Sequence, residues 1–187
     1  SEITVLLNQY WGDVTEQVRR LEMSMGAVQH VFHEGSAQKG EAAITYLEHA
    51  NSPAFPLVKE LWLRKANIHD LEDEELFLEN LDLQRILMVG MITTTVGQKI
   101  FDWYTDARER RFASMGKRID ESIGENETGL LIIGHDHQIQ FPHDMQILYV
   151  SPPSLNTLQQ KIRDSAPAAT QSEESSPDDG TKENKEE

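Results

Sequence analysis

Histidine and acidic side chains follow two predicted strands of this sequence. The strand at residues 27–32 is followed by His33 and Glu34, and the strand at 129–133 is followed by Gly-His-Asp-His at 134–137. Imidazole and carboxylate groups gathered in one crevice can bind a divalent metal ion or act as acid and base. An equally available interpretation is structural, because these residue types also satisfy free backbone groups in loops after strands.

A parallel sheet would bring these residues together, because ligands gather beyond the carboxyl ends of its strands. The β-branched run at 2–7 predicts a first, central strand, and residues 13–25 carry apolar side chains at helical spacing after an aspartate cap. With the strand at 27–32, these segments predict a βαβ unit with parallel strands. Further short strands are predicted at 68–71 and 146–150.

The remaining periodic segments predict helices. Apolar residues from 73 to 104 recur at three and four positions, with interruptions at Gly90 and Gly97, and indicate two helices or one bent helix. Other helices are predicted at 40–50, 57–65, 106–122 and 154–164. The prediction is an α/β fold: a mainly parallel sheet with flanking helices and a helical insertion.

Length and composition limit the organisation and the partners. The 187 residues suit one domain, predicted at 1–164, and the acidic segment 165–187 lacks large apolar side chains and is predicted to be a disordered tail. A net charge of −15 repels phosphate backbones and anionic lipids, so neither nucleic acid nor a membrane is an expected partner. The absence of cysteine is compatible with a reducing compartment, and the cytoplasm is the expected location.

The order of these features resembles the TraB, ChaN and erythromycin-esterase-like superfamily, which includes the Tiki proteases. The shared pattern is a strand, a helix, a strand ending in an acidic residue, an arginine-rich helix, and a strand followed by Gly-x-x-His. It covers most of residues 2–150 through short motifs. Some branches of the superfamily look like metal-dependent hydrolases, and others like haem-binding or regulatory proteins.

The resemblance implies a site at particular positions of this sequence. Glu34 matches the acidic residue that closes the second strand, and His137 matches the histidine of the late motif. Arg108 or Arg110 resembles the arginine of the family's helix start. Glu72 resembles an acidic residue after a middle strand.

The sequence departs from the family pattern after the first predicted strand. Family enzymes usually carry Gly-x-x-His or Glu-x-x-His there, and this chain has Asn-Gln-Tyr-Trp at 8–11. Tryptophan neither ligates a metal nor transfers a proton, which favours a non-catalytic binding or regulatory protein. The alternative is a metal-dependent hydrolase, in which four side chains would hold a divalent ion that activates water. Those four are His33, Glu34, His135 and His137.

Other enzyme classes fit the sequence less well. The segment 134–137 also resembles the last motif of calcineurin-like metallophosphoesterases, but the aspartate and asparagine-histidine motifs of such a dinuclear centre are missing. The sequence contains no glycine-rich phosphate loop, so a nucleotide cofactor is not indicated. It also contains no Gly-x-Ser-x-Gly elbow for a serine nucleophile.

Overall fold

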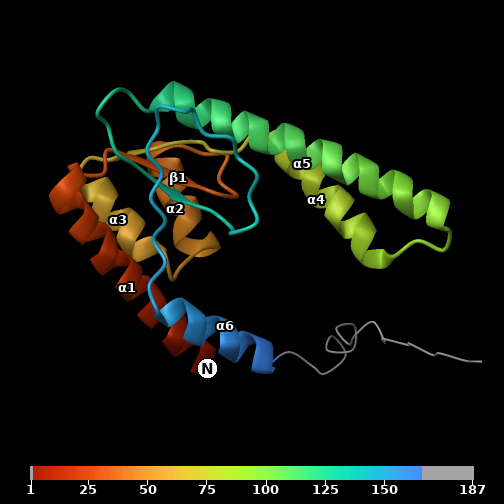
Figure 1. Cartoon of the computed structure of the whole chain (residues 1–187), viewed down its shortest axis with the longest axis horizontal. Coiled ribbons are helices and arrows are strands. Elements are labelled where there is room, and N and C mark those ends of the chain that lie inside the picture. Colours follow the sequence, from red (N-terminus) through yellow and green to blue (C-terminus); the bar gives the residue numbers. More distant parts are fainter. Residues whose placement is uncertain (1, 166–187) are drawn as a thin grey trace, which may run out of the picture.

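The structure is a computed structural model that describes residues 2–165. The described chain forms α1 (Glu2–Met25), β1 (His30–His33), α2 (Gly40–Ala50), α3 (Phe55–Leu63), β2 (Asn67–Ile68), α4 (Glu74–Val89), α5 (Thr94–Ser122), β3 (Gly129–Ile132) and α6 (Ser154–Ser165) (Figure 1). Among these residues, every helix is too short or too polar to cross a membrane. Except for Ser165, which ends α6, the predicted tail lies outside the described residues.

The three strands form a parallel sheet in the order β2-β1-β3. The parallel direction was predicted correctly, but the sheet is small and helices account for most of the described chain. All four residues of β1 are buried, and successive side chains enter opposite faces of the sheet. Val31 packs with residues of α1, α2 and α3, whereas Phe32 packs with Phe112 and Met115 of α5. The sheet therefore separates two hydrophobic cores.

Several predicted elements are wrong. Residues 2–7 are helical and begin α1, so the chain has no βαβ unit over its first thirty residues, and residues 146–150 form no regular structure. These residues continue the same helix as residues 8–25, and α6 packs against α1, with an ion pair between Lys161 and Glu2 at 2.7 Å. The break expected between residues 104 and 106 is absent, because α5 is continuous from Thr94.

Helices α4 and α5 form an antiparallel hairpin. The Asp73 side chain caps α4 by accepting hydrogen bonds from two backbone N–H groups, and Gly90 ends the helix with a positive φ of 76°. The buried residues of α5 all lie between Ala107 and Ile119, where α5 covers the sheet. Beyond them, α4 and residues 94–106 of α5 extend away from the body as the arm (Figure 1).

Candidate functional site

The carboxyl ends of the three parallel strands meet at one edge of the sheet. Glu34 follows β1, Glu72 lies four residues after β2, and residues 133–137 follow β3. We call this set of residues the carboxyl edge. Because the strands run in the same direction, side chains from segments far apart in sequence come within hydrogen-bond distance.

Arg111 of α5 joins two carboxylates at the carboxyl edge. Its Nε donates to Glu72 Oε2 at 3.0 Å, and its Nη2 donates both to Glu72 Oε1 and, at 3.0 Å, to Glu34 Oε1. The Arg111 and Glu72 side chains are only 8% and 0% exposed, and the Glu34 side chain is 30% exposed. We call these three residues the ionic lock, because they tie α5 to the loops that follow β1 and β2.

Backbone N–H groups also donate to both carboxylates of the ionic lock. The backbone N–H of Gly35 donates to Glu72 Oε1 at 2.9 Å, and that of Gly134 donates to Glu34 Oε2 at 2.8 Å. Each of the four oxygens therefore accepts at least one hydrogen bond, as buried charges require.

Aromatic rings surround the guanidinium of Arg111. Its central carbon lies 5.3 Å from the centre of the Phe77 ring and 5.6 Å from that of Phe112, distances at which a cation is attracted to the ring face. Burial lowers the pKa of Arg111, but the Glu72 and Glu34 carboxylates more than offset burial, so the net pKa is raised. Arg111 is therefore a fixed cation at the base of the arm.

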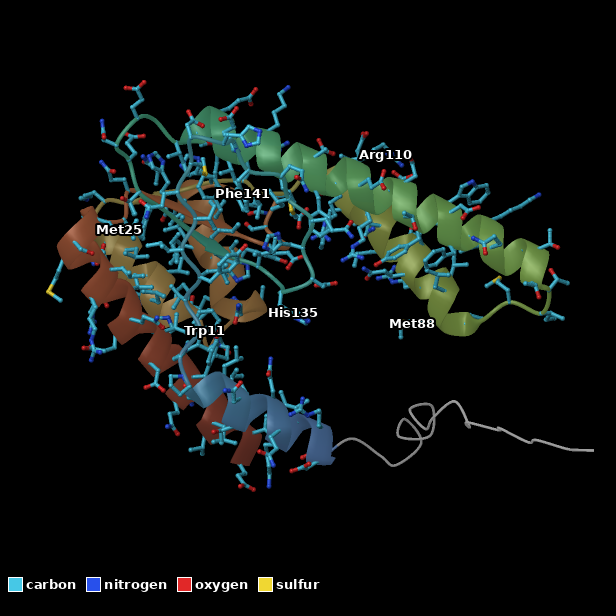
Figure 2. The ribbon with its side chains drawn as sticks, viewed as in Figure 1. Trp11, Met25, Met88, Arg110, His135 and Phe141 are labelled. Atoms are coloured by element: carbon cyan, nitrogen blue, oxygen red, sulfur yellow. The ribbon has the colours of Figure 1, made fainter. Side chains whose placement is uncertain are left out.

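The two arginines predicted from the resemblance lie elsewhere. Arg108 is at the rim of the carboxyl edge, where its Nη2 donates to the carbonyl and the carboxylate of Asp136 at 2.6 and 2.9 Å. Arg110 points away from the edge and pairs with Glu79 and Asp106 on the arm; these carboxylates raise its pKa (Figure 2). The central arginine is Arg111, which the sequence analysis did not select.

His33 is held inside the protein by both ring nitrogens. Nδ1 lies within hydrogen-bond distance of the Glu34 carbonyl, and Nε2 lies 2.9 Å from the amide nitrogen of Asn51. The amide can only donate, so Nε2 accepts and Nδ1 carries the proton. Burial lowers the pKa of His33, which favours the neutral ring. Neither nitrogen is free to ligate a metal.

The late histidines differ from each other. His135 is exposed, whereas His137 rests edge-on against Phe141, with 6.0 Å between ring centres. Nδ1 of His137 is buried and has no hydrogen-bond partner. Within residues 2–165, no three His, Cys, Asp or Glu side chains are arranged to hold a metal ion. The four ligands expected at His33, Glu34, His135 and His137 are therefore not brought together as a preformed metal centre.

A second histidine cluster was missed by the sequence analysis. His30, the first residue of β1, lies between two partners: its Nδ1 is 2.9 Å from His69 Nε2, and its Nε2 is 2.9 Å from Glu127 Oε2. The His69 ring stacks on Phe32, with 4.7 Å between centres. Burial, followed by the neighbouring His30, lowers the pKa of His69. Only the three-dimensional arrangement of the strands reveals this contact, because the partners are far apart in sequence.

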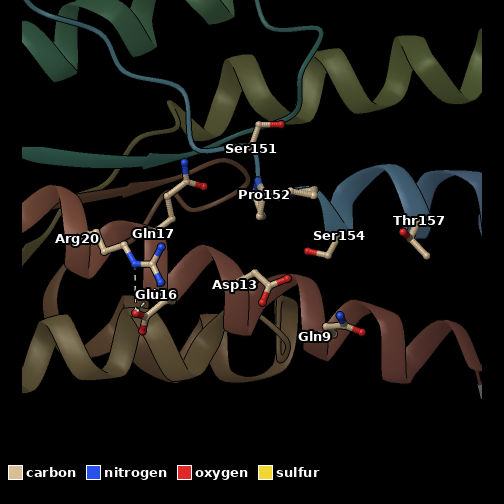
Figure 3. A pocket seen from close by; sticks show the side chains of 10 residues that line it. Gln9, Asp13, Glu16, Gln17, Arg20, Ser151, Pro152, Ser154 and Thr157 are labelled. Carbon is tan, nitrogen blue, oxygen red and sulfur yellow. Dashed lines mark hydrogen bonds and ion pairs between the residues drawn. The ribbon is translucent and has the colours of Figure 1, made fainter.

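A cavity of about 700 Å³ lies between α1 and the start of α6 (Figure 3). Most of its lining residues are polar, and three of them are charged: Asp13, Glu16 and Arg20. Glu16 and Arg20 pair with each other at 3.3 Å. None of its lining residues belongs to the carboxyl edge. The cavity and the predicted chemistry therefore occupy different parts of the molecule.

Comparison with known proteins found no family model, no curated protein and no solved structure that matches this chain.

Proposed function

We propose that this protein has a non-catalytic binding or regulatory role, in which the carboxyl edge fixes the position of the arm. The observation that carries the proposal is the ionic lock. Every oxygen of Glu34 and Glu72 is occupied by Arg111 or by a backbone N–H group. A general base must instead reach the proton that it removes from a substrate or water.

The ionic lock also suits a structural task. Arg111 lies where the arm leaves the body, and its guanidinium contacts Phe77 of α4 as well as Glu72 after β2. Residues from both helices of the hairpin are thereby fixed to the sheet edge. A rigid base lets the arm present its side chains to a partner at a lower cost in conformational entropy.

The broader assignments are proposals of the same kind. We propose a divergent relationship to the TraB and ChaN-like superfamily, supported by the positions of Glu34 and Glu72 after parallel strands and of an arginine on the helix that covers them. A cytoplasmic location without nucleic-acid partners is supported by the lack of cysteine and the charge of −15.

One observation favours the second candidate, a metal-dependent hydrolase with a divalent ion near Glu34 and His137. The buried Nδ1 of His137 has no partner, and such an atom normally has one. Two of the four expected ligands do not fit this function, because the side chains of Glu34 and His33 are already engaged on all their donor and acceptor atoms.

Metal content separates the two candidates. The purified full chain is incubated with zinc, manganese or ferrous iron, freed of excess ion, and analysed by mass spectrometry. The binding or regulatory role predicts less than stoichiometric metal in the wild type and no change in His137→Ala or Glu34→Gln. The control is His143→Ala, at an exposed histidine. Near-stoichiometric metal that is lost in both site variants, but kept in the control, would overturn the proposal.

A further inference from the structure

The arm exposes a regular stripe of side chains on the face of α4 that points away from α5. Leu78, Asp82, Arg85 and Val89 are spaced by four, three and four residues, so they lie on one side of the helix. Leu78 and Val89 are 52% and 84% exposed, and the side chains of Asp82 and Arg85 are 72% and 75% exposed. The buried residues of the same helix, Asn80 and Leu83, lie on the opposite side.

The stripe is complementary to itself. In an antiparallel pair of α4 helices centred between Asp82 and Arg85, Leu78 of one copy lies level with Val89 of the other. Asp82 then lies level with Arg85 of the second copy. A two-fold axis between the two copies therefore creates two apolar contacts and two ion pairs from the same four residues of each copy. Such use of one surface by both copies defines an isologous interface.

The distribution of charge favours a second copy over other partners. The segment from 86 to 98 is uncharged, with Arg85 and Lys99 at its ends, whereas the first two turns of α4 carry Glu74, Glu75 and Glu79. In the antiparallel arrangement these glutamates lie level with uncharged residues of the second copy, so no acidic residue of α4 faces another acidic residue. The arm also projects from a protein of net charge −15, so contact through the arms keeps the two acidic bodies apart (Figure 1).

We propose that the outer face of α4 is a homodimer interface, in which two arms pair antiparallel through Leu78, Asp82, Arg85 and Val89. The inference rests on the proposed binding role, because the ionic lock fixes the arm that presents this face. Within one chain, Arg85 and Asp82 already contact each other at 3.3 Å. Such an exposed pair contributes little to stability, so it exchanges readily for the ion pair between copies. Ile86 of the same helix is also exposed.

The first test measures the mass of the full chain by light scattering and sedimentation equilibrium at concentrations up to about 0.5 mM. One helix face is at the small end of the range of specific interfaces, so the dimer is expected to form in a concentration-dependent way. Asp82→Arg and Arg85→Asp, made singly, place like charges opposite each other and should raise the dissociation constant about tenfold or more. The double exchange Asp82→Arg with Arg85→Asp restores opposite charges and should restore the dimer.

Control variants distinguish this interface from a general charge effect. Glu16→Arg changes charge by the same amount in an exposed ion pair on α1 and should leave the dimer unchanged. A wild-type chain that stays monomeric at every concentration would overturn the inference. So would single charge variants that dimerise like the wild type. Neither outcome changes the metal measurement, so the proposed function would stand or fall separately.

Cross-linking tests the antiparallel arrangement directly. The chain contains no cysteine, so Leu78→Cys and Val89→Cys provide single reactive sites. When the two variants are mixed and oxidised, peptide mass spectrometry should find mainly the disulfide between positions 78 and 89. A preference for 78–78 and 89–89 disulfides would refute the antiparallel pairing. A monomer that instead floats with phosphatidylcholine vesicles, and loses this binding in Val89→Asp, would assign the face to a lipid surface and overturn the homodimer.

Discussion

Replacing Arg111 by methionine tests whether the ionic lock stabilises the fold. The substitution keeps an unbranched apolar side chain between Phe77 and Phe112, but it leaves the carboxylate of Glu72 without a counter-charge. Because the Glu72 side chain is fully buried, water cannot replace the guanidinium. Removing one partner of a buried ion pair destabilises a protein by about 3–5 kcal/mol. This is a large part of the total stability of an ordinary domain, about 5–15 kcal/mol.

Urea unfolding followed by circular dichroism measures this loss. In thermal unfolding of a chain of this length, a loss of 3–5 kcal/mol corresponds to a fall in Tm of about 6–20 °C. The control is Arg110→Met, which removes an arginine one residue away whose ion pair with Glu79 is 43% and 45% exposed. An exposed pair contributes about 0–1 kcal/mol, so this variant should unfold close to the wild type.

A double variant separates lost charge pairing from lost packing. Arg111→Met combined with Glu72→Leu removes both buried charges, and such replacements are often neutral or better than the pair. It should therefore recover much of the stability that Arg111→Met loses, although the Gly35 N–H loses its acceptor. If Arg111→Met is no more damaging than Arg110→Met, the lock does not stabilise the fold and our reasoning is wrong.

Two further predictions concern pH and helix capping. Burial lowers the folded-state pKa of both His33 and His69, so below about pH 6.5 the unfolded chain binds more protons than the folded one. The free energy of unfolding therefore falls as the pH drops through about 6.5, by at most about 1.4 kcal/mol per pH unit for each histidine. Unfolding midpoints between pH 8 and 5 should show this slope, and an equal slope in His33→Gln with His69→Gln would contradict it. Asp73→Ala removes the acceptor for two N–H groups of α4 and should cost about 1 kcal/mol in urea unfolding, whereas the exposed change Asp144→Ala should cost little.

The sequence predicts those elements whose local pattern of apolar and turn residues matches the structure that they form. The segments near 30 and 130 carry the apolar runs Val-Phe and Leu-Leu-Ile beside turn residues, and β1 and β3 lie there. The β-branched run at 2–7 has the same local character, yet it is helical because α6, from the other end of the described chain, packs against it. Such long-range packing overrides local strand propensity, and nothing in the first residues signals it.

The structure brings together some of the residues that sequence reasoning selected and leaves others apart. Glu34 and Glu72 follow two parallel strands of the sheet, and in the structure both carboxylates bind Arg111. Choosing the arginine of the site requires knowing which side chains of α5 face the sheet. Arg111 lies four residues from both Ala107 and Met115, which are buried. Arg110 is out of this phase, whereas Arg108 shares it, because it lies four residues before the buried Phe112. The helical phase of α5 therefore excludes Arg110 but does not by itself distinguish Arg111 from Arg108.

Helix α6, at the C-terminal end of the described chain, packs against α1 at its N-terminal end. The segment 133–153 that leads to it contains no helix or strand, and α6 contributes a single buried side chain, Leu158. The helix can therefore detach from α1 without opening either hydrophobic core, so it forms a local unfolding unit of its own. Its contact with α1 also links the packed helices that are farthest apart in sequence, so we expect it to form late in folding. The N-terminal half of α1 is thus covered only in the last, least stable layer of the fold.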